Sequence, residues 1–379
     1  METILTLRQK EFNKRFERLL FATKQHLRKK ENSCLSSPIH VVYVLNHTSV
    51  CGGVKIILEH AHYLTLNGIK VTLISHFKRP TWLNWEGHYL QIPFTEELTC
   101  GIPQCDIIVA TYWDHIQACI DTHIAPVIYF EQGDYHLFER HTISSDLLNF
   151  IDTQFTLPNF FMTVTTPVAT LINTLYSQHC TVIPNAVNTD YFNLNTTSFN
   201  HSHPYILMLG SDETPFKGLD EIRIAYKRLK MFLPYLDLIW ITPTAPLLPH
   251  FETALTVVNP AQQIIAQLYR GALAFISASH YESFSLPVLE AMSCGCPVVT
   301  TDNLGIHEYA LHHINALITP INNIDTLTET IFTLLTSPKL RLSLIKGGIK
   351  TAKNYTWASS ISKLISFYKQ VAQYEVSPV

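Results

Sequence analysis

The sequence predicts an α/β protein built from two domains, each with a parallel β-sheet. Its 379 residues exceed the usual size of one domain. Hydrophobic residues make up 47% of the chain and charged residues only 15%, which fits large buried sheets and excludes a disordered chain. A pattern of apolar strand, loop and helix opens near residue 39 and again near residue 205.

The predicted first domain opens with a βαβ unit and continues with short apolar strands. Gly52 and Gly53 stand just before its first helix, where a residue without a side chain lets backbone approach a ligand closely. The polar stretch from Asn193 to His203 is typical of a linker to the second domain. Helices are expected over 54–66 and from 167 to about 176, and strands over 39–45, 71–75, 107–110, 127–130 and 161–166.

Polar side chains follow the predicted strand 127–130. Ligand groups belong at the carboxyl ends of strands in this architecture. We therefore expect Gln132 and Asp134 to contact a sugar or an acceptor, with His136 as a third candidate. The alternative is that Asp134 only caps a turn.

Residues 1–32 are predicted to form a basic helical arm. Leu5, Phe12, Phe16 and Leu19 recur roughly at helical spacing among many Lys and Arg residues. One interpretation is a helix that packs on the body with a solvated basic face. The other is a helix that contacts a membrane surface or a second copy of the chain.

The predicted second domain contains a loop framed by two glutamates. Glu282 lies in the loop 279–286, and Glu290 lies eight residues later in a short helix that begins near Pro287. A helix N-terminus favours phosphate, and carboxylates accept hydrogen bonds from sugar hydroxyls. The alternative is a helix-capping Glu282 and an exposed Glu290. Strands are expected over 205–209, 238–242, 257–260, 274–278 and from 298, and helices over 219–229, 261–270, 288–292, 327–335, 340–354 and 357–373.

Several classes of function are disfavoured by what the sequence lacks. The eight cysteines form no C-x-x-C pair and the 19 histidines no H-E-x-x-H pattern, so neither disulfides nor a metal site is expected. The missing G-x-G-x-x-G argues against a dinucleotide-dependent oxidoreductase, and no cofactor is expected. A net charge of -3 gives no reason to expect nucleic-acid binding. Without a signal peptide or a long apolar run, we expect a cytoplasmic protein that can contact the inner face of the membrane.

The stretch that begins at Glu282, E-S-F-S-L-P-V-L-E-A-M-S-C-G-C-P-V-V, resembles the E-x7-E motif of bacterial-type family 4 retaining glycosyltransferases, which have the GT-B fold. It departs from the usual form at Ser283 and Ser285, where glycine is more common. The segment that ends in Lys217-Gly218 resembles the family's G-R-x-x-x-x-K-G, with Ser211 in place of the phosphate-binding arginine. Arg223 and Arg270 are candidates to replace that arginine.

The resemblance implies two Rossmann-like domains with parallel sheets that face each other across a cleft. It implies domains over 33–195 and 196–355, after the arm and before a last segment, 356–379, that crosses back to the first domain. It also implies a sugar moved from a nucleoside-diphosphate sugar, with UDP favoured, to a glycan, lipid carrier or protein, with retention and without metal. The implied catalytic residues are Glu282 and Lys217, and the implied donor-binding residues are Glu290, Ser283, Phe284, Ser285, Leu286, Gly52, Gly53 and Asn259.

Two other readings of the same resemblance stay open. A GT-B epimerase or phosphorylase would act on the same ligands. A non-catalytic subunit that binds a nucleotide sugar within a larger glycosylation complex would also fit, since the expected arginine is missing.

Overall fold

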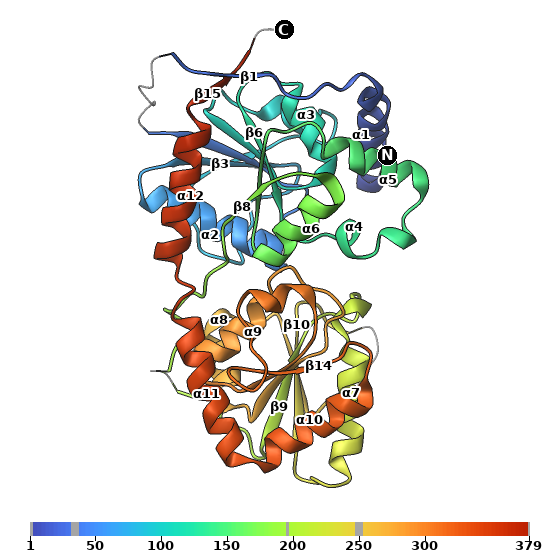
Figure 1. Cartoon of the computed structure of the whole chain (residues 1–379), viewed down its shortest axis with the longest axis vertical. Helices are drawn as coiled ribbons and strands as arrows, with labels where there is room; N and C mark the ends of the chain where they lie inside the picture. Colours follow the sequence, from blue (N-terminus) through green and yellow to red (C-terminus); the bar gives the residue numbers. More distant parts are fainter. Residues whose placement is uncertain (1–2, 32–37, 195–196, 247–252, 378–379) are drawn as a thin grey trace. The chain divides into compact units, whose positions relative to one another are not determined.

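The computed structural model describes residues 3–31, 38–194, 197–246 and 253–377, and the chain divides into two compact units. Unit 1 comprises Met1–Pro184 and Ala358–Val379, and unit 2 comprises Asn185–Trp357. Each unit is a parallel sheet with helices packed against it (Figure 1). The predicted α/β class with two parallel-sheet domains is confirmed.

The sheet of unit 1 has seven strands within the described chain, all parallel. Its central strands are buried throughout, which explains their continuous apolar runs. The chain adds strands first on one side of β2 and then on the other, so the strand order reverses between β2 and β5. Across the sheet the strands are β4 (His88–Gln91), β3 (Lys70–Ser75), β2 (His40–Val44), β5 (Ile107–Ala110), β6 (Val127–Glu131), β7 (Phe160–Thr163) and β8 (Cys180–Val182).

Helices from both ends of the chain belong to unit 1. The hydroxyls of Tyr43 in β2 and Tyr368 in α12 lie 2.5 Å apart in its core, so the last helix is an integral part of this unit. The helices are α1 (Ile4–Arg18), α2 (Gly52–Leu66), α3 (Ile116–Ile120), α4 (Tyr135–Phe138), α5 (Ser145–Gln154), α6 (Thr166–Tyr176) and α12 (Trp357–Val371).

Unit 2 repeats the doubly wound plan, and its strand order reverses between β9 and β12. One face of the sheet packs on α7 and α10 through residues such as Ile206 and Trp240. On the other face Tyr269 of α8 meets Phe275 of β12 edge to face at 5.3 Å. The strands are β11 (Leu255–Val258), β10 (Asp237–Thr242), β9 (Tyr205–Leu209), β12 (Ala274–Ser277), β13 (Val298–Thr301) and β14 (Leu317–Thr319), and the helices are α7 (Leu219–Lys230), α8 (Gln262–Gly271), α9 (Leu286–Ser293), α10 (Ile324–Thr336) and α11 (Pro338–Ala352).

The arm predicted to be helical over residues 1–32 is helical only in its first half. Helix α1 ends at Arg18, and the chain later forms a strand, β1 (Leu27–Lys29), that pairs antiparallel with β15 (Tyr374–Val376). The Gln25 side chain donates to the Ala125 carbonyl at 3.0 Å and accepts from the Val127 amide at 2.9 Å. These contacts hold the chain against unit 1, and the long-range strand pairing replaces helical hydrogen bonds.

Candidate functional site

The two residues predicted to be catalytic meet in unit 2. Lys217 ends a short 3-10 helix after β9, and Glu282 lies in the loop after β12. The Lys217 Nζ donates to Glu282 Oε1 at 2.6 Å, and the Ser279 hydroxyl donates to the same oxygen at 2.8 Å. Each charge is therefore balanced by the other in this structure.

Gly218 makes this approach of the two loops feasible. Its φ of +64° is left-handed, and a Cβ built on it would lie 2.2 Å from the Ala278 carbonyl oxygen. Only glycine fits a position that is both left-handed and this crowded. The β9 loop can therefore press directly against the end of β12, which sets Lys217 beside Glu282.

The pair lies where the strand order of unit 2 reverses. Strands β9 and β12 are hydrogen-bonded neighbours, and the loops that carry Lys217 and Glu282 leave their carboxyl ends. In open α/β sheets ligands bind in the crevice outside such a reversal. The sheet topology thus marks this pair as the candidate site of unit 2 independently of any motif.

The start of α9 has an unusual backbone. Ser285, the residue before the helix, is left-handed, with φ 60° and ψ 59°. The Tyr309 hydroxyl donates to its carbonyl at 2.7 Å and so fixes this turn. A left-handed position favours glycine, which gives a physical reason for the glycine that is usual here in the family that the sequence resembles.

Phe284, predicted to bind the donor, has its side chain in the core. It is 2% exposed and packs against Tyr309 and Tyr355, with ring centroids 5.4 and 5.8 Å away. Its side chain therefore supports the loop, and only backbone groups are left to face a ligand. The first amides of α9, including that of Leu286, have no acceptors within the helix, as at any helix start.

Glu290 is buried in α9 rather than exposed on it. The residue is only 5% exposed, so the alternative of an exposed helix residue is wrong. Burial raises the pKa of the Tyr269 phenol, and the charge of Glu290 raises it further; burial and the charges of Glu282 and Glu290 likewise raise the pKa of Tyr309. An ionised carboxylate in such a place is costly unless partners hold it.

Both arginines proposed to replace the missing phosphate ligand are bonded to other groups. Arg223 bonds Asp212 at 2.6 Å and lies over the Trp240 ring, where it braces the loop after β9. Arg270 donates to the backbone carbonyls of Tyr191, Asn193 and Thr197 and so fastens the chain that enters unit 2. Lys217 is thus the cation that the structure brings to Glu282.

Asn259, a further predicted donor-binding residue, follows β11. It is left-handed, with φ 44°, and its amide donates to the Thr242 carbonyl at 2.8 Å. It therefore forms a tight turn at the carboxyl end of the sheet, two strands away from β9.

In unit 1 the structure brings Gly53 and Gln132 together. A Cβ built on Gly53 would lie 3.5 Å from Gln132 Nε2, whereas one built on Gly52 would meet nothing within 4 Å. Both glycines belong to the first turn of α2, which begins at Gly52 with Cys51 as its N-cap. The helix therefore starts two residues before the prediction, and the glycines are not a separate loop.

His136 is fully buried, which corrects its assignment as a residue that contacts a ligand. Its Nε2 lies 3.3 Å from Glu131 Oε2 and its Nδ1 lies 3.7 Å from Asp134 Oδ2. Burial alone would lower its pKa, but the two carboxylates outweigh burial and raise the pKa of His136 to about 9. The histidine is therefore a buried cation that holds the turn after β6.

Asp134 caps α4, as the alternative interpretation of this residue expected. Its carboxylate accepts from the Tyr135 amide at 2.8 Å and from Trp113 Nε1 at 2.9 Å. Gln132, by contrast, has its amide over the start of α2. Of the three acceptor candidates, His136 is buried and Asp134 caps a helix, whereas Gln132 is partly exposed beside the start of α2.

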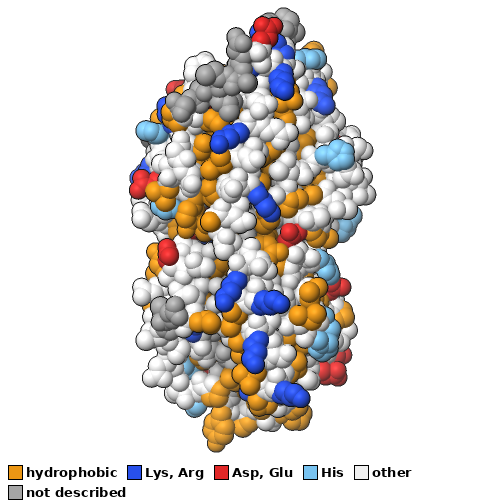
Figure 2. Space-filling view, turned by 60° about the vertical axis from the view of Figure 1, so that its left-hand side comes forward, with side chains coloured by type: hydrophobic (Ala, Val, Ile, Leu, Met, Phe, Trp, Pro, Cys, Tyr) orange, Lys and Arg blue, Asp and Glu red, His pale blue; other side chains and the backbone are white. Residues whose placement is uncertain are grey.

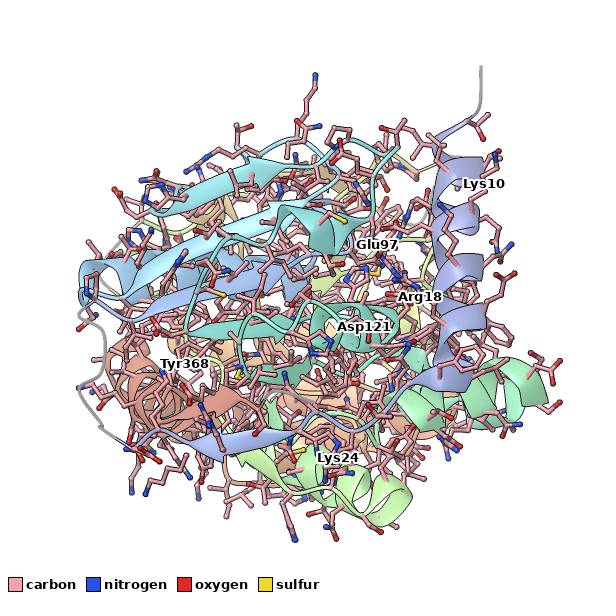
Figure 3. The ribbon with its side chains drawn as sticks, turned by 90° about the horizontal axis from the view of Figure 1, so that it is seen from above. Lys10, Arg18, Lys24, Glu97, Asp121 and Tyr368 are labelled. Atoms are coloured by element: carbon pink, nitrogen blue, oxygen red, sulfur yellow. The ribbon has the colours of Figure 1, made fainter. Side chains whose placement is uncertain are left out.

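Helix α1 carries a charged network that sequence reasoning missed. Arg15 is 2% exposed, and its guanidinium bonds Glu11 at 2.6 Å, Glu97 at 2.7 Å and Asp114 at 3.0 Å. Glu11 also pairs with His76. The partners His76, Glu97 and Asp114 follow strands β3, β4 and β5, so α1 crosses the carboxyl ends of this sheet (Figure 3). The spacing of four residues between Glu11 and Arg15 was the available signal in the sequence.

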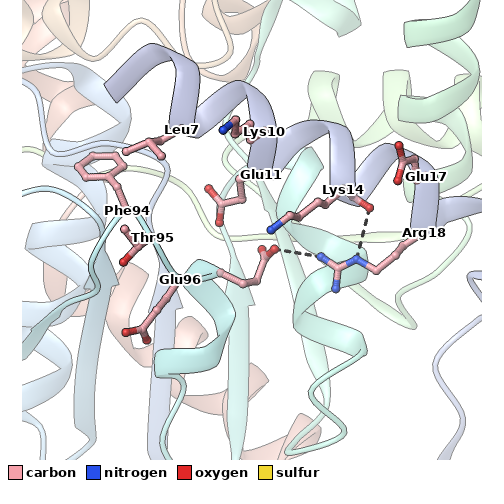
Figure 4. A pocket seen from close by; sticks show the side chains of 10 residues that line it. Leu7, Lys10, Glu11, Lys14, Glu17, Arg18, Phe94, Thr95 and Glu96 are labelled. Atoms are coloured by element: carbon pink, nitrogen blue, oxygen red, sulfur yellow. Dashed lines mark hydrogen bonds and ion pairs between the residues drawn. The ribbon is translucent and has the colours of Figure 1, made fainter. Parts of the chain in front are cut away.

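A groove lies between α1 and the loop that follows β4 (Figure 4). Its volume is about 570 Å³. Lysines 10 and 14 line one side, and Phe94, Glu96 and Glu97 line the other. The lining carries both signs of charge, and Arg18 crosses it to Glu97 at 2.9 Å.

Three statements on metal sites, membrane spans and cysteines hold for the described residues only. No cluster of three or more His, Cys, Asp or Glu side chains could hold a metal ion. No helix combines the length and the hydropathy of a membrane span. Seven cysteines are free thiols, and Cys34 lies outside the described residues.

Comparison with known proteins identifies a family segment within unit 2. Residues 256–351, which include Glu282 and Glu290, match the family described as glycosyl transferases group 1. The O-antigen chain mannosyltransferase B of Escherichia coli is 33% identical over 102 residues, which is 27% of this chain and 26% of that protein. A D-inositol 3-phosphate glycosyltransferase of Saccharomonospora viridis is 27% identical over 108 residues, 28% and 25% of the two chains. The chain thus spans about a quarter of these curated relatives.

Solved structures match over most of the chain. The sucrose-phosphate synthase of Thermosynechococcus elongatus has a TM-score of 0.73 at 14% identity and covers 88% of this chain and 98% of its own. The Anabaena protein Alr3699/HepE in complex with UDP-glucose has a TM-score of 0.69 at 16% identity and covers 87% and 100%. The chain therefore has the GT-B fold, as the sequence predicted, and its residues 256–351 are similar to glycosyl transferases group 1.

Proposed function

We propose that the protein is a retaining, metal-independent glycosyltransferase of family 4 that transfers a sugar from a nucleoside-diphosphate sugar, preferably a UDP-sugar. The acceptor is a glycan, a lipid carrier or a protein. The observation that carries this proposal is the Lys217–Glu282 pair at the strand reversal of unit 2. Support also comes from the matched segment and from the UDP-glucose bound to Alr3699/HepE, a protein of the same fold.

Donor binding would break the ion pair between Lys217 and Glu282. Lys217 exchanges the Glu282 carboxylate for the diphosphate, whose charge a lysine and the first amides of α9 can balance together. Glu282 is then released to accept a hydrogen bond from a hydroxyl of the donor sugar. Glu290, which is buried in α9, accepts from the ribose hydroxyls.

The reaction proceeds on one face of the sugar. The bond from the anomeric carbon to the phosphate oxygen breaks, and a bond to the acceptor oxygen forms. The acceptor proton passes to the leaving phosphate, so no side-chain base is needed. Lys217 stabilises the charge that develops on the leaving nucleoside diphosphate.

A binding test comes first. Melting curves with UDP-, GDP-, ADP- and dTDP-sugars should show stabilisation by one donor class, with the UDP-sugar expected to raise Tm most. Titration calorimetry then compares variants: Glu290→Ala weakens nucleotide binding, while Glu282→Ala mainly lowers kcat. The exposed Glu329→Ala on α10 is the matched control and changes neither. If no donor stabilises the protein, the proposal fails.

A second candidate is a non-catalytic subunit that binds a nucleotide sugar. It is favoured by Ser211, which stands where the family has a phosphate-binding arginine. Tight donor binding with neither transfer nor donor hydrolysis, across glycan, lipid and protein acceptors, would support this candidate instead.

A further inference from the structure

The carboxyl-terminal part of the chain has an extreme charge bias. Residues 330–374 contain no Asp or Glu, although the whole chain has a net charge of -3. The same stretch holds seven basic residues: Lys339, Arg341, Lys346, Lys350, Lys353, Lys363 and Lys369. A basic segment of this length is stable only if its positive side chains are solvated or meet negative groups.

Four of these residues form one row along α11 and its C-cap, here called the lysine row: Lys339, Lys346, Lys350 and the C-cap residue Lys353. Their spacings of seven, four and three residues place them on one side of the helix. All four are exposed, whereas Leu344, Gly348 and Ala352 of the same helix are buried. In Figure 2 basic side chains form a column on the face of unit 2 that is turned toward the viewer.

The lysine row has no partners within the part of the chain that the structure describes. No ion pair or hydrogen bond joins any of the four side chains to another residue there. Arg341 is separate, because its guanidinium donates to the Leu334 carbonyl at 3.1 Å at the end of α10. Asp325 of α10 pairs with Arg228 at 2.5 Å, so it does not neutralise the row. Helix polarity explains a lysine in the last turn but not a row along the whole helix.

The row is long, straight and partly apolar. Fourteen residues of helix span about 21 Å. Leu342 lies on the same side of the helix and is 59% exposed. Lysines around an exposed leucine resemble a helix that rests on a membrane surface, where ammonium groups meet lipid phosphates and the apolar side chain enters the boundary.

We propose that α11 docks on an anionic lipid bilayer through the lysine row and Leu342. A lipid surface fits better than nucleic acid. The row has no arginine to bind phosphate in a fork and no aromatic side chain on which bases could stack. The negative net charge of the whole chain also limits indiscriminate binding of polyanions. This surface is distinct from the Lys217–Glu282 site and does not depend on the proposed reaction.

Vesicle sedimentation of the full chain tests the proposal. Vesicles of phosphatidylcholine with about one third phosphatidylserine should bind the protein, and pure phosphatidylcholine should not. Binding should weaken as salt rises from 50 to 500 mM. Lys346→Gln with Lys350→Gln should lower the partition coefficient about 30-fold, taking about 1 kcal/mol per lysine. Leu342→Ser should lower it further.

A matched pair of substitutions on α1 tests whether the vesicles bind α11 rather than α1. Lys10→Gln with Lys14→Gln removes the same charge from the helix that the sequence marked as an alternative membrane contact, and it should leave the partition coefficient within about twofold. The proposal is overturned if wild-type protein ignores anionic vesicles. It is equally overturned if the α1 pair abolishes binding while the α11 pair does not, or if single-stranded RNA binds the row and vesicles do not. Circular dichroism checks that these surface variants are folded.

Discussion

The left-handed Ser285 allows a test in which two similar substitutions should have opposite effects. Glycine is usual at positions 283 and 285 in the family that the sequence resembles, so ancestry alone would favour both replacements. The backbone conformation distinguishes the two positions. Ser285 has φ 60°, whereas Ser283 is not among the described residues with positive φ. We expect Ser285→Gly to stabilise unit 2 and Ser283→Gly to destabilise it.

The size of the effect follows from the backbone. A non-glycine residue in the left-handed region costs about 1–2 kcal/mol. Glycine offsets part of the gain, because it loses about 0.5–1 kcal/mol more conformational entropy on folding. The Ser285 side chain makes no capping hydrogen bond to α9, so little else is lost. The free energy of unfolding should therefore rise by about 0.5–1 kcal/mol for Ser285→Gly and fall by about 0.5–1 kcal/mol for Ser283→Gly.

Urea unfolding followed by tryptophan fluorescence measures both variants. Trp240 lies in the core of unit 2 and reports its transition. Calorimetry should give a Tm about 2 °C higher for Ser285→Gly, since 1 kcal/mol shifts Tm by about 2–4 °C in a unit of this size. A lower midpoint for Ser285→Gly, or equal shifts for the two variants, would refute the argument from backbone conformation.

Three further predictions concern unit 1. The pKa of His136 is raised to about 9, so its ion pairs stabilise the unit fully below pH 6.5 and lose that contribution as pH rises through 9. Melting curves from pH 6 to 10 should show this loss, and His136→Gln should remove that part of the slope. Burial would raise the pKa of Glu11, but His76 and a buried arginine outweigh burial and lower it to about 2. The Glu11 contribution to stability is therefore present above pH 4.5 and is lost as pH falls toward 2. Glu11→Gln should lower the free energy of unfolding by about 1–3 kcal/mol at pH 7, and in urea titrations the stability of the variant should fall less steeply at acid pH than that of the wild type. Gly53→Ala adds a methyl group in van der Waals contact with the Gln132 amide and covers one side of it, so it should raise a substrate KM, whereas Gly52→Ala, with open space around it, should not. Equal KM values would remove Gln132 from the site.

The sequence was sufficient for many of the regular elements, although it did not predict the strands β4, β8 and β14 or the helix α5. Continuous apolar runs identified the buried strands, and a glycine or proline near a helix end placed α2, α7 and α9 within about three residues. Glu282 and Lys217 were predicted to share a site and lie 2.6 Å apart. These features depend on local pattern, or on loops that leave neighbouring strands.

Other features depend on partners far away in the sequence. Strand β1 exists because β15 pairs with it across most of the chain, and neither three-residue segment has a strand pattern of its own. Arg15 was expected on a solvated face, because its buried carboxylate partners Glu97 and Asp114 lie on other elements. His136 was expected to contact a ligand for the same reason, since its burial and its contact with Glu131 appear only in the three-dimensional structure.

The order in which the two units can form follows from their division along the chain. Unit 2 is one continuous stretch, whereas unit 1 needs Ala358–Val379, which the ribosome makes after all of unit 2. Until then the Tyr43 hydroxyl lacks the Tyr368 partner that it meets in the finished core. The unit that is second in the sequence can therefore finish folding first. The nascent first unit would meanwhile expose an apolar sheet surface that chaperones recognise.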